Sequence, residues 1–271
     1  SNIKETVSFR EAVLKGAATG HGLYFPSVIP QLPESFFSEL EGMNLPELAA
    51  EIIHYYTEED FSREQVQDIC NEAFNFPIPL VQIEPSVYTL ELFHGPSLAF
   101  KDVGARFLAE VLKKISTEEE NEFTVLVATS GDTGSAVAKS FFDVKGVKVV
   151  LLYPSGKVST LQEKTLTTMG GNVSAIEVDG SFDDCQRLVK AAFADDDLNK
   201  NLKLTSANSI NIGRFLPQTV YYFWAWKQLS AEERQNLTIA VPSGNYGNLS
   251  AGILAHKMGL PVRKFVAASN I

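Results

Sequence analysis

The chain has 271 residues, a formal net charge of −10 at pH 7, and 45% hydrophobic and 21% charged residues. This is the composition of a folded globular protein that is long enough for two domains, and no apolar run approaches the length of a membrane span. The negative charge disfavours nucleic acids and anionic membrane surfaces as partners. A small-molecule partner is expected, and an anionic one would need a local cluster of donors.

Cysteine usage and the first residues predict a cytoplasmic protein. Cys70 and Cys185 lie in helical patterns and are expected to be core thiols without a disulfide framework. The first five residues lack the apolar core of a signal peptide. The four histidines are scattered without ligand spacing, so no metal site is predicted.

Residues 1–87 are predicted to form a small, mainly helical N-terminal region. Ser8 and Glu11 have the spacing of a capping box, which predicts a short helix that ends at Gly16. Amphipathic helices are predicted over residues 45–56 and 63–74, and strand structure with a turn at Pro85 and Ser86 is predicted over 81–92. The region shows no obvious chemistry, so it is expected to pack against a site or to wall one side of it.

Strand-like and helix-like segments alternate from Phe93 onward. Strands are predicted over residues 124–129, 147–153, 173–178, 204–206, 238–241 and 265–268, and helices over 135–142, 160–169, 182–194, 212–229 and 249–258. This alternation predicts an α/β fold in which helices cover both faces of a mostly parallel sheet. Such sheets bind ligands beyond the carboxyl ends of their strands.

Lys101 follows a glycine-proline turn and opens an amphipathic helix. The helix macrodipole disfavours an ammonium at this position, and the apolar neighbours Ala99 and Phe100 disfavour it further by desolvation. Both effects predict a lowered pKa, which an imine-forming lysine requires. The alternative is a surface lysine that lies over Phe100 and pairs with Asp102 or with a helix further on.

A glycine-containing loop follows one predicted strand and opens the next predicted helix. It consists of Ser243, Gly244, Asn245, Tyr246, Gly247 and Asn248. Two glycines allow backbone N–H groups at a helix N-terminus to approach a ligand closely, which predicts a phosphate site. The spacing matches neither the Walker A motif nor G-x-G-x-x-G, and a tight turn without a ligand is the alternative.

A second strand-to-helix loop, residues 129–135, concentrates hydroxyl groups and backbone donors. Thr129, Ser130 and Thr133 are candidates for binding a substrate carboxylate. The alternative is that Asp132 or Thr133 is the N-cap of the following helix.

A third loop places neutral donors before an arginine. Asn208, Ser209 and Asn211 precede Arg214. A guanidinium group with neighbouring amide donors can hold a phosphate bidentately. The alternative is a helix cap with an exposed arginine.

An imine-forming lysine, a phosphate loop, a carboxylate loop and a second anion site are the parts that a pyridoxal phosphate enzyme for a phosphorylated amino acid needs. The sequence resembles the threonine synthase family, pyridoxal phosphate enzymes related to tryptophan synthase β. The resemblance rests on residues 92–102 (LFHGPSLAFKD), 128–134, 206–211, 242–247 and, near the start, 22–26. It extends along essentially the whole chain.

The resemblance implies a tryptophan synthase β-like fold with residues 88–271 as the catalytic region and about 103–207 as a smaller mobile subdomain. It implies that Lys101 is the catalytic residue and carries pyridoxal 5'-phosphate, whose phosphate the 243–248 loop binds. Asp132 would lie near the pyridoxal hydroxyl, although relatives often have asparagine there. The candidates in the second loop would hold the substrate carboxylate, and Asn208, Ser209, Asn211 and Arg214 would hold the substrate phosphate.

The implied reaction of threonine biosynthesis converts O-phospho-L-homoserine and water to L-threonine and phosphate, by γ-elimination and β-addition of water. A threonine or serine dehydratase with the same cofactor, or a catalytically silent phosphometabolite-binding relative, is the alternative. A monomer or homodimer is expected. Because family members are longer, the serine or threonine that faces the pyridine nitrogen is expected beyond Ile271, and the chain is expected to be a fragment.

Overall fold

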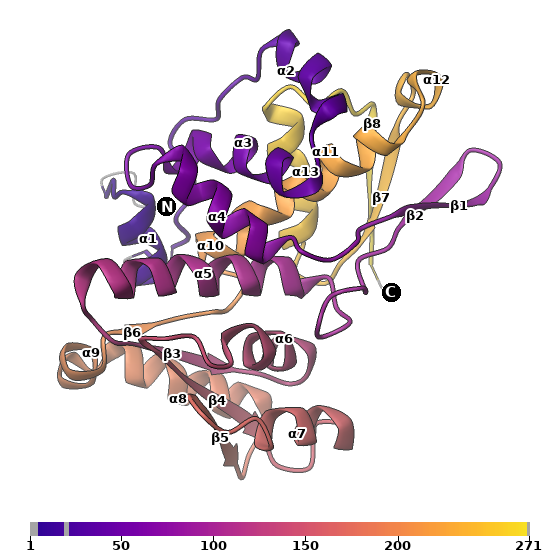
Figure 1. The fold of residues 1–271 in the computed structure, drawn as a ribbon. Helices are drawn as coiled ribbons and strands as arrows, with labels where there is room; N and C mark the ends of the chain where they lie inside the picture. The colour runs from indigo at the N-terminus through magenta and orange to yellow at the C-terminus, as the bar shows by residue number, and fades with distance from the viewer. Residues whose placement is uncertain (1–4, 19–21, 270–271) are drawn as a thin grey trace. The chain divides into compact units, whose positions relative to one another are not determined.

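The computed structural model describes residues 5–18 and 22–269 (Figure 1). The helices are α1 (Phe9–Lys15), α2 (Glu34–Glu39), α3 (Leu45–Thr57), α4 (Arg63–Ala73), α5 (Lys101–Glu119), α6 (Asp132–Phe141), α7 (Thr160–Thr167), α8 (Phe182–Ala194), α9 (Asp196–Leu202), α10 (Ile212–Phe215), α11 (Thr219–Gln228), α12 (Ala231–Arg234) and α13 (Gly247–Lys257), with 3-10 turns η2 (Leu40–Gly42) and η3 (Leu216–Gln218). The strands are β1 (Leu80–Glu84), β2 (Val87–Leu90), β3 (Phe123–Ala128), β4 (Val147–Pro154), β5 (Val173–Val178), β6 (Leu204–Thr205), β7 (Thr238–Pro242) and β8 (Lys264–Ala268).

The chain forms two compact units, each built from two segments that are distant in sequence. Unit 1 comprises Ser1–Tyr24 and Gly95–Arg214, and unit 2 comprises Phe25–His94 and Phe215–Ile271. The boundary expected after residue 87 and the mobile subdomain expected over 103–207 stay predictions. Among the described residues, no helix is both long enough and apolar enough to cross a membrane.

Unit 1 contains a parallel sheet with the strand order β5-β4-β3-β6. The chain runs outward from β3 to β4 and β5, and then returns to place β6 on the other side of β3. The direction of winding therefore changes between β3 and β6. Loops that leave the carboxyl ends of strands at such a switch point form the ligand crevice of open α/β sheets. The loops after Ala128 and Thr205 are in this position.

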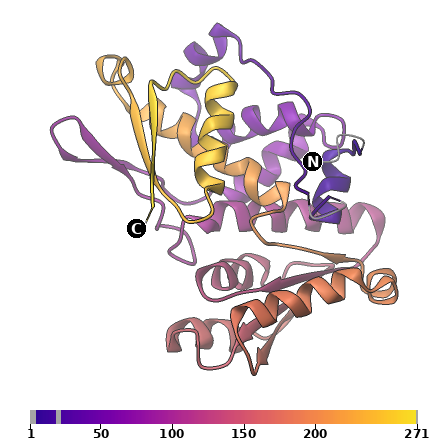
Figure 2. The same cartoon turned by 180° about the vertical axis from the view of Figure 1, so that it is seen from behind.

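Helices cover both faces of this sheet, as expected from the alternating pattern (Figure 2). Leu126 and Ala128 of β3 pack with Cys185 and Val189 of α8 in one hydrophobic cluster. Successive side chains of a strand point to opposite faces, so Val127 belongs to the other face, where α5 and α6 contact β4. All six residues of β3 are buried, which is typical of a central strand in a parallel sheet.

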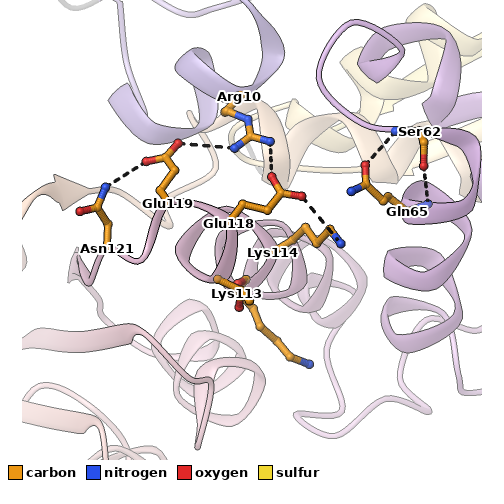
Figure 3. A network of polar contacts seen from close by, with 9 residues as sticks. Arg10, Ser62, Gln65, Lys113, Lys114, Glu118, Glu119 and Asn121 are labelled. Atoms are coloured by element: carbon orange, nitrogen blue, oxygen red, sulfur yellow. Dashed lines mark hydrogen bonds and ion pairs between the residues drawn. The ribbon is translucent and has the colours of Figure 1, made fainter.

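The N-terminal helix α1 belongs to unit 1. Its Phe9 ring contacts Phe107 of α5 with the ring centroids 6.5 Å apart in an edge-on arrangement. The Val13 side chain is fully buried. At the other end of α5, the guanidinium of Arg10 is paired with the carboxylates of Glu118 and Glu119 (Figure 3).

Unit 2 combines helices with two small sheets. β1 and β2 form an antiparallel hairpin, whereas β7 and β8 are parallel and frame α13. The aromatic helix α11 packs against α3 and α13. A Cβ atom on Gly252 of α13 would lie 2.5 Å from Cε1 of Tyr222, so only glycine permits this approach of α13 to α11.

The predicted α/β class is confirmed, and the main difference lies in the last third of the chain. The helix predicted over 212–229 is divided into α10, η3 and α11. Pro217 lies in the first turn of η3, where its missing N–H interrupts the helical hydrogen-bond pattern. Three short helices, α2, α9 and α12, were not predicted because they have too few residues for a clear periodicity.

Candidate active site

Lys101 is the first residue of α5, and its side chain is 24% exposed. Its Nζ lies 3.8 Å from Oδ2 of Asp132 and 4.6 Å from the centroid of the Phe100 ring. Burial lowers the pKa of Lys101, and the positive charge of Arg214 lowers it further, whereas Asp132 acts in the opposite direction. The predicted lowering is confirmed. The contacts of the alternative interpretation are also present: Lys101 lies over the Phe100 ring and pairs with Asp132, which is on a helix further along the chain.

The loop after β3 is folded around the hydroxyl of Thr129. This residue is 1% exposed, and its Oγ1 accepts hydrogen bonds from the N–H groups of Gly131, at 3.2 Å, and Gly134, at 2.8 Å. The hydroxyl is thus used inside the loop. Ser130 is exposed and Thr133 is half-buried. The N-cap of α6 is Gly131, so the interpretation of Asp132 or Thr133 as the N-cap is wrong.

The loop after β6 is held by the amide of Asn211, which is fully buried. Its Nδ2 donates to the carbonyl oxygens of Val13, at 2.9 Å, and Ser206, at 2.8 Å, and its Oδ1 accepts from the N–H of Gly213 at 2.9 Å. Asn211 therefore ties this loop to α1. Asn208 is half-buried, and its backbone N–H donates to the Ser206 hydroxyl at 3.2 Å. Ser209 is exposed.

Arg214 is 3% exposed, so the alternative of an exposed arginine is wrong. Its Nη1 donates to the carbonyl oxygen of Ala207. Gly104, one turn beyond Lys101 on α5, lies against it, because a Cβ there would be 2.7 Å from the Arg214 carbonyl oxygen and 3.3 Å from its Nε. The structure thus brings together Lys101, Asp132 and Arg214, which are three of the predicted site residues.

The 243–248 loop belongs to unit 2 and links β7 to α13. Ser243 Oγ accepts from the backbone N–H of Tyr246 at 2.8 Å, and Tyr246 has a left-handed backbone with φ of 54°. A Cβ on Gly244 or Gly247 would meet nothing within 4 Å. The N-terminus of α13 therefore has open space beside both glycines, as a ligand that approaches the backbone would require.

Three residues that the sequence analysis did not assign to the site also shape this region. Asp102 is 1% exposed, and its Oδ2 accepts from the N–H of Ser97 at 2.9 Å, which fixes the turn before Lys101. Lys139 of α6 donates to the carbonyl oxygen of Pro96 at 2.8 Å. Gln162 of α7 donates to Asp132 at 3.1 Å. The contact of Asp102 spans 5 positions in sequence, whereas those of Lys139 and Gln162 span 43 and 30. A local sequence pattern therefore does not indicate the contacts of Lys139 and Gln162.

Two family profiles together match nearly the whole chain. The profile of the threonine synthase N terminus matches residues 1–74, and the profile of pyridoxal-phosphate dependent enzymes matches residues 74–270. Threonine synthase of Escherichia coli (strain K12) is 47% identical over 98% of this chain and 62% of its own length. Threonine synthase of Schizosaccharomyces pombe is 39% identical over 97% of this chain and 54% of its own length.

The comparison with solved structures also finds threonine synthases. The crystal structure of threonine synthase from Escherichia coli matches with a TM-score of 0.92 over 99% of this chain and 62% of that one, at 47% identity. A pyridoxal phosphate-bound threonine synthase from Brucella melitensis matches with a TM-score of 0.89 over 97% of this chain and 57% of that one, at 37% identity. The chain thus spans less than two thirds of the length of these relatives. It belongs to the family of pyridoxal-phosphate dependent enzymes, and its first 74 residues match the threonine synthase N terminus.

Proposed function

We propose that the chain binds pyridoxal 5'-phosphate covalently through Lys101 and converts O-phospho-L-homoserine and water to L-threonine and phosphate. The observation that carries the proposal is the environment of Lys101, a largely buried amine with a lowered pKa at the start of α5. A lysine must be deprotonated to attack a carbonyl carbon, and these conditions favour its neutral form. Membership of the family and the names of the relatives support the same cofactor and product.

The residues present fit the cofactor. The 243–248 loop offers backbone N–H groups at a helix N-terminus and free space beside Gly244 and Gly247, which suits a phosphate dianion. We assign Ser243, Gly244, Asn245, Tyr246, Gly247 and Asn248 to the cofactor phosphate. Asp132, beside the Lys101 amine, is assigned to the polar edge of the pyridoxal ring.

The substrate is assigned to the loops at the carboxyl ends of β3 and β6. Ser130 and Thr133 would bind its carboxylate, and Asn208, Ser209 and Arg214 would bind its phosphate. Thr129 and Asn211 would support these loops from within, because their polar atoms are occupied by backbone partners. This division of roles follows from burial and hydrogen bonding.

Pyridoxal phosphate, when bound, supplies an electron sink for an attached amino acid. The substrate amine would take the place of the Lys101 amine on the cofactor. Lys101 would then remove the proton from Cα of the substrate, since its Nζ remains close to that carbon. Its lowered pKa keeps the amine able to accept this proton. The guanidinium of Arg214 would stabilise the phosphate as it leaves Cγ, and the exposed hydroxyl of Ser130 would orient the substrate carboxylate.

Borohydride trapping tests the cofactor assignment. The chain is incubated with pyridoxal phosphate, reduced, digested and mapped by mass spectrometry, and we expect the label on Lys101 and its loss in Lys101→Ala. Lys113→Ala is the matched control, because Lys113 lies on the same helix and pairs with Glu110. A label that stays after Lys101→Ala would refute the assignment. Phosphate release from O-phospho-L-homoserine, compared with ammonia release from threonine, separates the synthase from a dehydratase.

Cellular location and assembly are part of the proposal. The two cysteines are free and buried, which fits a reducing compartment such as the cytoplasm. A monomer or homodimer with a small-molecule substrate is proposed.

A further inference from the structure

The amide of Gln162 joins two helices of unit 1. Its Oε1 accepts from the N–H of Ser159, at 3.1 Å, and from the Ser159 hydroxyl, at 3.0 Å, and so closes the capping box of α7. Its Nε2 donates to Oδ1 of Asp132, at the start of α6, at 3.1 Å. Both ends of one planar amide are thereby used, which fixes its orientation.

Gly131 permits this contact. A Cβ at position 131 would lie 3.2 Å from Cδ of Gln162 and only 2.6 Å from its Nε2, and the second distance is closer than Cβ atoms approach in proteins. The residue before Asp132 must therefore lack a side chain for the amide to lie where it does. The close approach and the hydrogen bond both follow from the same placement of the Gln162 amide against the start of α6.

The other oxygen of the Asp132 carboxylate, Oδ2, lies 3.8 Å from Nζ of Lys101. The Asp132 side chain is 61% exposed, and an exposed ion pair of this kind contributes little and competes with solvated rotamers. A donor on the second oxygen restricts the rotamers of the carboxylate. The charged groups that act on Lys101 are Asp132 on α6 and Arg214 on α10.

We propose that Gln162 is a positioning residue that acts through Asp132, holding its carboxylate beside the reactive amine of Lys101. The capping box of α7 then has a function beyond helix stability, because the same amide that caps α7 sets the charge environment of the amine. The consequence for catalysis rests on the proposed function, but the coupling of Gln162 to Lys101 exists without cofactor. It is therefore tested without cofactor.

The experiment measures the pH dependence of trace acetylation of Lys101 by acetic anhydride, read by peptide mass spectrometry on the folded chain. Gln162→Ala frees the carboxylate to leave the amine, so the stabilisation of the ammonium is reduced. We expect the pKa of Lys101 to fall by about 0.5. Asp132→Asn should lower it at least as much. In the Asp132→Asn background, Gln162→Ala should have no further effect, because the charge through which it acts is gone.

Two controls separate positioning from helix capping. Ser159→Ala removes the N-cap hydroxyl of α7 but keeps the Gln162 amide and the Ser159 N–H that donates to its Oε1, so it should change the pKa of Lys101 less than Gln162→Ala does. Gln65→Ala makes the same substitution in the capping box that Ser62 and Gln65 form at α4 (Figure 3). It should leave Lys101 unchanged. Gln162→Asn, whose amide is too short to reach Asp132, is the second variant if the alanine protein does not fold.

The proposal is overturned if the pKa of Lys101 is the same in Gln162→Ala as in the parent chain. It is equally overturned if the shift persists in the Asp132→Asn background, or if Ser159→Ala reproduces it. Failure of the proposed function gives a different result. The chain would then show the coupling by acetylation and still carry no borohydride-trapped cofactor on Lys101.

Discussion

Lys101 and Arg214 place two basic groups in one region of unit 1, and the charge of Arg214 acts on the Lys101 amine. The positive charge of Arg214 lowers the pKa of Lys101, because it disfavours a second cation nearby. Replacing the guanidinium by a neutral amide in Arg214→Gln removes this repulsion. The protonated amine is then favoured, so the pKa of Lys101 rises. We expect this rise to be seen in the same acetylation profile.

The pH dependence follows from the sign of this change. In Arg214→Gln, the neutral amine forms only at higher pH, so acetylation at any pH below the parent pKa of Lys101 is slower. Arg187→Gln is the matched control, because the guanidinium of Arg187 is exposed and pairs with Asp184. An unchanged profile in Arg214→Gln would mean that solvent screens the two charges from each other.

The packing of α5 against α10 depends on the absence of a side chain at Gly104. A Cβ there would lie 2.7 Å from the backbone carbonyl oxygen of Arg214. This oxygen can move away only if the backbone of α10 moves with it. Gly104→Ala gains about 1 kcal/mol of helix propensity, but forced overpacking costs roughly 1–3 kcal/mol. We therefore expect a net loss of stability, seen as a lower urea midpoint. Gly42→Ala is the control, since a Cβ at Gly42 meets nothing within 4 Å. A higher midpoint for Gly104→Ala would contradict this explanation.

Elements with local signals were predicted well. α8 covers 182–194 as predicted, because Ser181 and Asp184 form a capping box ahead of a regular apolar stripe. The start of α6 was misplaced by three residues, since Gly131 supplies no capping side chain and Asp132 is already helical. At the candidate site, the lowered pKa of Lys101 was predicted from its local context. Gln162 was missed because its partner Asp132 is 30 positions away, and no periodicity encodes such a contact.

At the scale of the whole molecule, each unit depends on chain segments far apart in sequence, and α1 is the clearest case. The carbonyl oxygen of Val13 accepts from the Thr205 hydroxyl and from the Asn211 amide, each at 2.9 Å. α1 thus supports β6 and the loop that leads to Arg214. Sequence patterns indicated the helix itself, but its place in unit 1 follows only from these long-range contacts.

Deleting residues 1–18 tests this dependence. The deletion exposes the partners of Phe9, Ala12 and Val13, whose burial contributes several kcal/mol, so we expect the thermal midpoint to fall by on the order of 10 °C. Arg10→Gln, which removes the ion pairs of Arg10 with Glu118 and Glu119, should lower the midpoint by no more than about 2 °C. Circular dichroism measures both. If the deleted chain has the same thermal midpoint as the parent chain, α1 does not stabilise unit 1, and the contact between Val13 and Asn211 contributes little to stability. If the thermal midpoint falls in the deleted chain but not in Arg10→Gln, α1 is held to unit 1 by apolar burial rather than by the charge of Arg10.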